Sequence, residues 1–329
     1  MTAAPPPVAI LGTGALAMRF GAVLGRAGHP VTLVGTWAAG LAALAAHGIA
    51  VDGDGRVAVG ARHLDDVVVD RTRGGRPAAE GAATPVPAAP IVLVLVKSHQ
   101  TARVAPAAAR LAAADGLVVT LQNGLGNAEA LAAAAGADRV AVGVTTLGAA
   151  VVGAGRVRLG GDGTVTIGRT PATAGRVDAL VAWLGAAGLE AAAVGDIAPA
   201  VWRKLAVNCA INPLSAVLGV PNGRLLDDPD AHAMLRAAAD EVGAVARALG
   251  VAVDDDLAAL AEAVADRTAA NRSSMLQDVE RGAPTEIDAI NGAVVRAGRA
   301  VGVATPVNEA LWRAIAERPV APTTASPAR

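Results

Sequence analysis

The chain has 329 residues and a formal net charge of −1, from 28 basic and 29 acidic residues. It contains neither a run of Lys and Arg nor a basic patch with interleaved aromatic residues, so it lacks the electrostatic pattern of a nucleic-acid-binding protein. The longest strongly apolar run, residues 91–96, is far shorter than the about 20 residues that span a bilayer, and the opening MTAAPPP has no feature of a secretory signal. The single cysteine, Cys209, excludes an intramolecular disulfide and fits an inert packed thiol in a reducing compartment. We therefore expect a cytoplasmic protein of two domains, without a membrane partner, that binds small molecules.

Apolar runs alternate with helical segments in the first half of the chain. VAIL at 8–11 precedes GTGALA at 12–17, a segment of helical character to about residue 27, and the β-branched run VTLV at 31–34. IVLVLVK at 91–97 and LVVTLQNG at 117–124 have the continuous apolar character of strands buried on both faces. This alternation predicts a parallel sheet covered by helices on both sides.

The pattern changes twice farther along the chain. Residues 71–90 are rich in Gly and Pro and are expected to form a surface segment. Residues 140–168 contain β-rich pieces punctuated by glycine, which predicts antiparallel strands at the end of the sheet, followed by a helix at about 173–187 and the short run LEAAAV. After Asp196 the strand patterns stop, and residues 199–316 have the pattern of successive amphipathic helices. The predicted fold class is α/β, with a doubly wound N-terminal domain at 1–195 and an all-α C-terminal domain at 196–329.

The glycines of GTGALA follow a strand and open a helix, which is the context of a Rossmann-type dinucleotide site. Gly12 permits the tight turn, and Gly14 lets the backbone approach a pyrophosphate at the positive end of the helix. A tight turn without a ligand would use the same glycines. The end of the second strand, VGTW, has neither an acidic residue for a ribose 2′-hydroxyl nor an arginine for a 2′-phosphate. Thr36 can hydrogen-bond either group, and the missing carboxylate favours NADPH without excluding NADH.

Polar residues follow two of the apolar strands, where open α/β sheets bind ligands. Lys97 comes directly after IVLVLV, and Asn123 precedes Gly124 in QNGLGN. Both also have an ordinary structural explanation, as a solvated charge at a strand end and as a turn residue. Their shared position makes them candidate ligand-binding residues.

The apolar segment RKLAVNCAINPLSAVLG, residues 203–219, carries a polar residue at every fourth position. On an α-helix, Lys204, Asn208 and Asn212 share one face. Burying an unpaired ammonium or carboxamide costs several kcal/mol, so this face must meet polar groups. An internal polar network, a helix interface and a ligand-binding wall all satisfy that requirement.

A second polar region, residues 271–295, follows in the helical half. Residues 282–285 break a helix, and Glu286 and Asp288 are predicted in the first turn of the next one, where carboxylates also occur merely to complement the helix dipole. In SSMLQD, Ser273 and Ser274 can cap a helix or hold a carboxylate. There is no zinc-ligand spacing, Walker loop or G-x-S-x-G motif, so neither metal nor serine chemistry is expected.

Taken in order, GTGALA, VKSHQT, QNGLGN, WRKLAVNCAINPLSAVLG, PNGRLL, SSMLQD and TEIDAINGAVV make the chain similar to the ketopantoate reductases (2-dehydropantoate 2-reductases). The resemblance covers residues 8 to about 316, and the lysine helix and the SSMLQD and TEID motifs are its specific part. It implies NADPH-dependent reduction of 2-dehydropantoate to (R)-pantoate, in the route to pantothenate and coenzyme A. It also implies a dinucleotide-binding first domain and a second domain that carries substrate and catalytic residues.

The resemblance assigns roles to individual residues. Lys204 would be the general acid that protonates the ketone oxygen, and Glu286 would hydrogen-bond the substrate's alcohol beside it. Lys97 would be an electropositive anchor near the cofactor and the substrate's carboxylate, and Asn123 would contact the nicotinamide side of the cofactor or the substrate. Expected substrate-binding residues are Asn208, Asn212, Asn222 and Ser274, and expected cofactor-binding residues are Gly12, Thr13, Gly14, Ala15, Leu16, Thr36, Lys97 and Asn123.

Alternatives remain at this level. The family commonly has an arginine at the position of Thr36, so the chain can instead be a paralogue that reduces another 2-keto acid or an imine. A nucleotide-binding sensor without turnover is a third hypothesis, which Lys204 and Glu286 argue against because a sensor needs no proton donor. The sequence is compatible with a homodimer but does not require one.

Overall fold

The computed structural model describes residues 4–68, 86–253 and 256–318. The described residues form two compact units. Of the described residues, the first unit contains those up to Val96, residues 100–122 and residues 127–197. The second contains those from Ala198 to Arg318 together with the short segments Lys97–His99 and Asn123–Gly126. Of the predicted Gly- and Pro-rich segment at 71–90, residues 71–85 lie outside the described residues, and its last two residues already belong to a strand.

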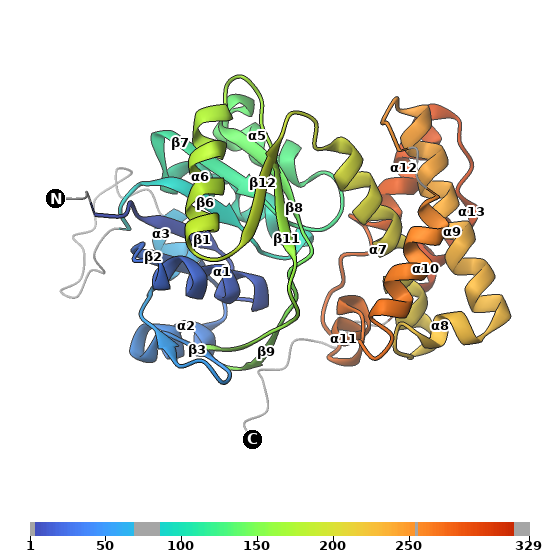
Figure 1. Cartoon of the computed structure of the whole chain (residues 1–329), viewed down its shortest axis with the longest axis horizontal. Coiled ribbons are helices and arrows are strands. Elements are labelled where there is room, and N and C mark those ends of the chain that lie inside the picture. The colour runs from blue at the N-terminus through green and yellow to red at the C-terminus, as the bar shows by residue number, and fades with distance from the viewer. Residues whose placement is uncertain (1–3, 69–85, 254–255, 319–329) are drawn as a thin grey trace. The chain divides into compact units, whose positions relative to one another are not determined.

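The described part of the first unit is built on an eight-stranded sheet that follows the predicted α/β pattern (Figure 1). All neighbouring strands are parallel except one antiparallel pair, β8 with β11. Across the sheet the strands are β12 (Glu190–Val194), β11 (Thr164–Gly168), β8 (Val140–Thr145), β7 (Ala112–Thr120), β6 (Ala89–Val94), β1 (Val8–Leu11), β2 (Val31–Gly35) and β5 (Gly60–His63).

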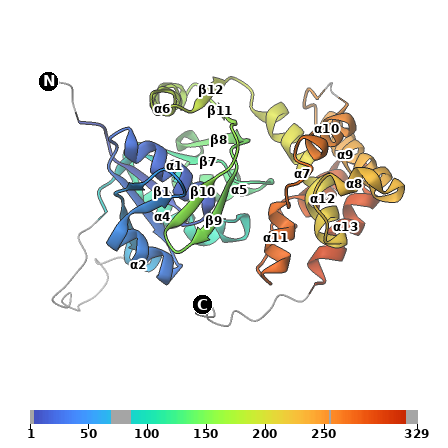
Figure 2. The same ribbon diagram turned by 60° about the horizontal axis from the view of Figure 1, so that its bottom comes forward.

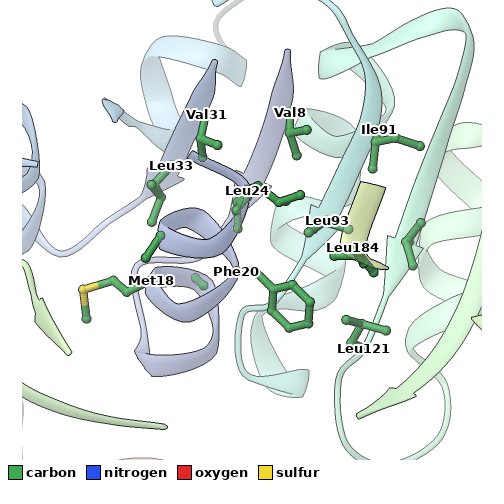
Figure 3. Close-up of a cluster of buried hydrophobic side chains, with 14 of the residues drawn as sticks. Val8, Met18, Phe20, Leu24, Val31, Leu33, Ile91, Leu93, Leu121 and Leu184 are labelled. Carbon is green, nitrogen blue, oxygen red and sulfur yellow. The ribbon is translucent and has the colours of Figure 1, made fainter. Parts of the chain in front are cut away.

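Helices cover both faces of this sheet because successive strand residues point to opposite sides. Val8 and Ile10 of β1 pack in a core with α1 and α6, whereas Ala9 and Leu11 pack in another with α4 and α5. Figure 3 shows the first core, with Phe20 of α1 among side chains of the strands. The helices of this unit are α1 (Ala15–Arg26), α2 (Ala38–His47), α3 (Leu64–Val68), α4 (Thr101–Leu111), α5 (Asn127–Ala135) and α6 (Ala174–Ala186).

A second sheet corrects the prediction for residues 140–168. Only β8 and β11 join the main sheet, and β8 runs parallel to β7. The pieces between them form a four-stranded sheet with a segment from much earlier in the chain. Its strands are β4 (Arg56–Val57), β3 (Ile49–Val51), β10 (Arg156–Leu159) and β9 (Ala149–Gly153).

The second unit is all-helical in its described C-terminal part, as the apolar periodicity predicts (Figure 2). Its longest helix, α7, packs against α9, α10, α11 and α13 around a core of its own. None of the described helices is long and apolar enough to cross a membrane. The helices are α7 (Ala198–Leu218), α8 (Arg224–Asp227), α9 (Pro229–Ala248), α10 (Leu257–Arg267), α11 (Ser274–Glu280), α12 (Asn291–Val301) and α13 (Pro306–Ala316).

Candidate functional site

Helix α7 carries Lys204, Asn208 and Asn212 in one continuous helical segment, so the three side chains share a face. Lys204 is half-buried, and its neighbours Leu205 and Ala206 are fully buried. Burial lowers the pKa of Lys204 to about 8, since desolvation disfavours the ammonium more than the Glu286 carboxylate favours it. An amine with this pKa exchanges its proton near neutral pH.

Glu286 is the centre of the polar cluster in the second unit. It lies in the turn between α11 and α12, so the prediction that it occupies the first turn of a helix is wrong; α12 begins only at Asn291. The carboxylate is 7% exposed. Its Oε1 accepts a hydrogen bond from the Ser98 N–H at 3.0 Å, and its Oε2 accepts one from Asn123 Nδ2 at 3.1 Å. These bonds hold the carboxylate in one orientation.

A backbone contact brings Asn123 to this position. Gly124 has φ +82°, and a Cβ added to it would lie 2.2 Å from the Ala289 carbonyl oxygen. Next to it, the Leu125 N–H donates to the same oxygen at 2.8 Å. The glycine of QNG therefore does more than form a turn, because only a residue without a side chain lets this segment dock against residues 286–289.

Lys97 lies between two carboxylates of the second unit. Its Nζ is 2.6 Å from Asp278 Oδ2 and 3.7 Å from Glu286 Oε2. Asp278 is 3% exposed and also accepts a hydrogen bond from Arg281 at 2.8 Å. Asp278 belongs to the SSMLQD motif but is not among the site residues expected from the sequence. Its signal was a carboxylate between the apolar residues of a short helix, which requires a buried partner.

The remaining predicted residues of this unit have other contacts. Asn208 reaches Asn123 at 3.4 Å, and Asn212 is buried. Ser274 is exposed at the start of α11, whereas Ser273 is the N-cap, with its Oγ accepting from Leu276 N at 3.1 Å. The structure therefore brings together Lys97, Asn123, Lys204, Asn208 and Glu286, while the side chain of Asn222 bonds Thr268 at 2.9 Å instead.

The glycine loop of the first unit joins β1 to α1. Gly12 has φ +135°, and its N–H donates to the Val34 carbonyl at 2.8 Å. Gly14 is the N-cap of α1 without a side-chain cap, and a Cβ added to it would meet no atom within 4 Å. The first turn, which includes Ala15 and Leu16, thus has no side-chain cap for its N–H groups at the positive end of the helix, and the space beside Gly14 is open. This cradle fits a dinucleotide phosphate.

Thr36 lies exposed at the end of β2, and Thr13 packs against Gly35 beside it. The next strand, β5, pairs in parallel with β2 so that His63 lies beside Gly35 and Arg62 beside Val34. The end of β2 therefore has basic residues on the neighbouring strand, which sequence reasoning missed because that pairing is not local in sequence. Asp65, 3.5 Å from His63, offsets part of this charge.

Comparisons with known proteins cover both halves of the chain. The family model Ketopantoate reductase PanE/ApbA matches residues 8–172, and the model Ketopantoate reductase PanE/ApbA C terminal matches residues 196–318. A 2-dehydropantoate 2-reductase of Halobacterium salinarum is 39% identical over 303 residues, which are 91% of this chain and 94% of the relative.

Solved structures extend this similarity. A PanE/ApbA family ketopantoate reductase from Ralstonia eutropha JMP134 superposes with a TM-score of 0.81 at 34% identity, covering 94% of this chain and 97% of that one. D-mandelate dehydrogenase, solved with NADH and anilino(oxo)acetate, gives a TM-score of 0.84 at 26% identity with the same coverage of both chains.

Proposed function

The chain belongs to the ketopantoate reductase PanE/ApbA family, and from this premise we propose that it reduces 2-dehydropantoate to (R)-pantoate with NADPH. The product would serve the synthesis of pantothenate and coenzyme A. The observation that carries the proposal is Lys204, a half-buried amine with its pKa lowered to about 8 by burial, beside the fixed carboxylate of Glu286.

Lys204 acts as the general acid in this reaction. Reduction of a ketone builds negative charge on its oxygen, so an ammonium aimed at that oxygen interacts more strongly with the transition state than with the ground state. The same group then delivers the proton that makes the alcohol. A pKa of about 8 leaves most Lys204 side chains protonated at neutral pH while still allowing them to release the proton.

Glu286 orients the substrate and keeps Lys204 charged. Ser98 and Asn123 fix its two oxygens, and it raises the pKa of Lys204 against the effect of burial. Asn208 and Asn212 on the same face of α7 supply amides for the substrate's hydroxyl groups. Ser274 and Asn222 lie outside the cluster around Glu286, so their proposed roles with the carboxylate and hydroxyl groups of the keto acid rest on the family resemblance alone.

The cradle at Gly12, Thr13, Gly14, Ala15 and Leu16 holds the pyrophosphate of the cofactor, with Lys97 and Asn123 towards its nicotinamide end. When bound, the reduced nicotinamide supplies the hydride. NADPH is preferred because Thr36 carries no charge that repels a 2′-phosphate, and the neighbouring strand end carries Arg62 and His63.

A second candidate function is reduction of a different 2-keto acid with NADH. It is favoured by Thr36, which does not provide the guanidinium that grips a 2′-phosphate, and by the similarity to D-mandelate dehydrogenase, solved with NADH and anilino(oxo)acetate. The proposed roles of Lys204 and Glu286 are the same in both candidates, because both reactions protonate a ketone oxygen.

The test is the loss of reduced-nicotinamide absorbance on addition of 2-dehydropantoate, with NADPH and NADH in parallel. Lys204→Arg keeps a positive charge but does not release its proton, so kcat should fall by about 100-fold or more while nucleotide binding stays unchanged. Arg224→Ala, which changes an exposed residue of α8, is the control. Binding of both nucleotides without turnover would favour another keto acid, and near-normal turnover by Lys204→Arg would contradict the acid role.

A further inference from the structure

Helix α7 contains a proline between its polar face and its C-terminal end. Pro213 has no N–H, so the carbonyl of Cys209, four residues earlier, loses the helical donor it would otherwise have. Cys209 is fully buried. A buried carbonyl without a donor costs about 1–3 kcal/mol. The helix that carries Lys204 therefore needs a donor from elsewhere at this point.

Asn291 provides that donor. It is the first residue of α12 and is fully buried. Its Nδ2 donates to the Cys209 carbonyl at 3.1 Å and to Asn308 Oδ1 at 2.9 Å. An apolar side chain at position 291 would leave the Cys209 carbonyl unpaired.

Asn291 is itself held by a polar chain that reaches two further helices. Asn308, fully buried in α13, donates from Nδ2 to Glu241 Oε2 at 2.7 Å and to the Ala238 carbonyl at 3.0 Å, both in α9. Glu241 also accepts the backbone N–H groups of Val307 and Asn308 at 2.8 and 2.9 Å, which fastens the start of α13. The position of the Asn291 amide is thus set by α9 and α13 as well as by α12.

We propose that Asn291 is a positioning residue for the catalytic helix: by replacing the hydrogen bond lost at Pro213, it sets the direction of the part of α7 that carries Lys204 and Asn208. Its kinetic consequence rests on the proposed function. Lys204 lies about 13.5 Å along the axis from Pro213, so a change of about 10° in the bend would move its Cα by about 2 Å. A misplacement of about 1 Å can cost about 100-fold in rate.

The test uses the proline itself. Asn291→Ala removes the side-chain donor, and adding Pro213→Ala restores a backbone N–H that can reach the Cys209 carbonyl. We expect Asn291→Ala to lower kcat by about 10- to 100-fold with a smaller change in the KM for cofactor. The double variant should recover to within about threefold of Pro213→Ala alone, because its helix is complete again.

A second readout does not depend on turnover. Lys97 and Lys204 are the chain's two lysines, so 13Cε-lysine NMR titration resolves the pKa of Lys204 directly. Asn291→Ala should shift the pKa of Lys204, and in the Asn291→Ala, Pro213→Ala double variant this pKa should be close to that of Pro213→Ala alone. Asn127→Ala, which removes a buried amide of the first unit bonded to Thr101, controls for general destabilisation and should leave the pKa unchanged.

The outcomes separate the inference from the function. If the wild type does not turn over 2-dehydropantoate but the Lys204 pKa follows this pattern, the function fails and the positioning role stands. The positioning role would be overturned if Asn291→Ala changed neither the pKa of Lys204 nor kcat. It would also be overturned if kcat and this pKa did not recover in the double variant. If Asn291→Ala does not fold, the double variant decides: folding with a normal Lys204 pKa supports the role, and failure to fold contradicts it.

Discussion

Lys97 and Lys204 are the two lysines of a chain whose other 26 basic residues are arginines. Both interact with Glu286, Lys97 at 3.7 Å and Lys204 through the field that raises its pKa. A guanidinium stays charged at any accessible pH, whereas a buried amine can release its proton. Lysine at position 204 therefore permits a proton transfer that arginine there would not.

The proposed acid role of Lys204 predicts a pH dependence of the rate that Glu286 influences. In ketone reduction the rate should fall as pH rises through about 8, because Lys204 then loses its proton. The carboxylate raises the pKa of Lys204, so Glu286→Gln should lower that pKa further and move the falling limb to lower pH. The measurement is the pH dependence of kcat, together with lysine NMR on the free enzyme.

Glu286→Gln can also weaken substrate binding directly. That effect would raise KM, but it would not change the NMR titration of Lys204 in the free enzyme. If the falling limb of the kcat profile and the Lys204 titration midpoint stay in place in Glu286→Gln, or move to higher pH, the Glu286 carboxylate does not raise the pKa of Lys204.

At the scale of elements, the docking of Asn123–Gly126 depends on one glycine. Gly124→Ala would push the segment from the Ala289 carbonyl, which a Cβ approaches to 2.2 Å, and so remove the Asn123 bond to Glu286. We expect kcat/KM to fall by about 10-fold or more, since the orientation of the carboxylate is lost. Steady-state kinetics measure the effect.

Gly126→Ala is the matched control. Gly126 also has a positive φ, of +89°, but a Cβ there would meet nothing within 4 Å. Both variants therefore share a backbone cost of about 1–2 kcal/mol, and any further loss of thermal stability in Gly124→Ala comes from the close approach to Ala289. Equal kinetic losses in the two variants would mean that backbone strain, and not the close approach, matters at Gly124.

The elements that sequence patterns predicted well are those whose pattern is local. VAIL became β1 at Val8–Leu11, and the polar stripe of residues 203–219 lies on one helix, because buried runs and a four-residue spacing need no distant partner. The small second sheet could not be predicted, since β3 and β4 have only three and two residues, and β3 is held by pairing with the distant β10 and β4 by pairing with β3. The helix expected at Glu286 does not form because of another contact that is distant in sequence. The Ala289 carbonyl accepts the Leu125 N–H, and Ile290 has a non-helical backbone with φ −97° and ψ −95°.

For the whole molecule, the sequence was enough to select the polar candidate residues but not to predict which of them contact one another. The cluster around Glu286 draws on residues 97–98, on Asn123, on α7 and on α11, which are far apart in the chain. Two of these segments follow strands of the first unit and are nevertheless packed within the second. Nothing in VKSHQT or QNGLGN shows this, because packing against the helices is decided by contacts such as Gly124 with Ala289.

The division into two units also predicts that cofactor choice and acid chemistry can be changed separately. Thr36 belongs to the first unit and Lys204 to the second. Thr36→Arg should raise the affinity for NADPH over NADH by about 10-fold or more, because a guanidinium pairs with a 2′-phosphate in charge-assisted hydrogen bonds. The pKa of Lys204 should not change, because a substitution at one of two independent sites does not alter the energetics of the other. Fluorescence titration with both nucleotides and lysine NMR on the same sample measure the two effects. An unchanged nucleotide preference would place the 2′-phosphate away from the end of β2, and a shifted Lys204 resonance would show that the two sites are coupled.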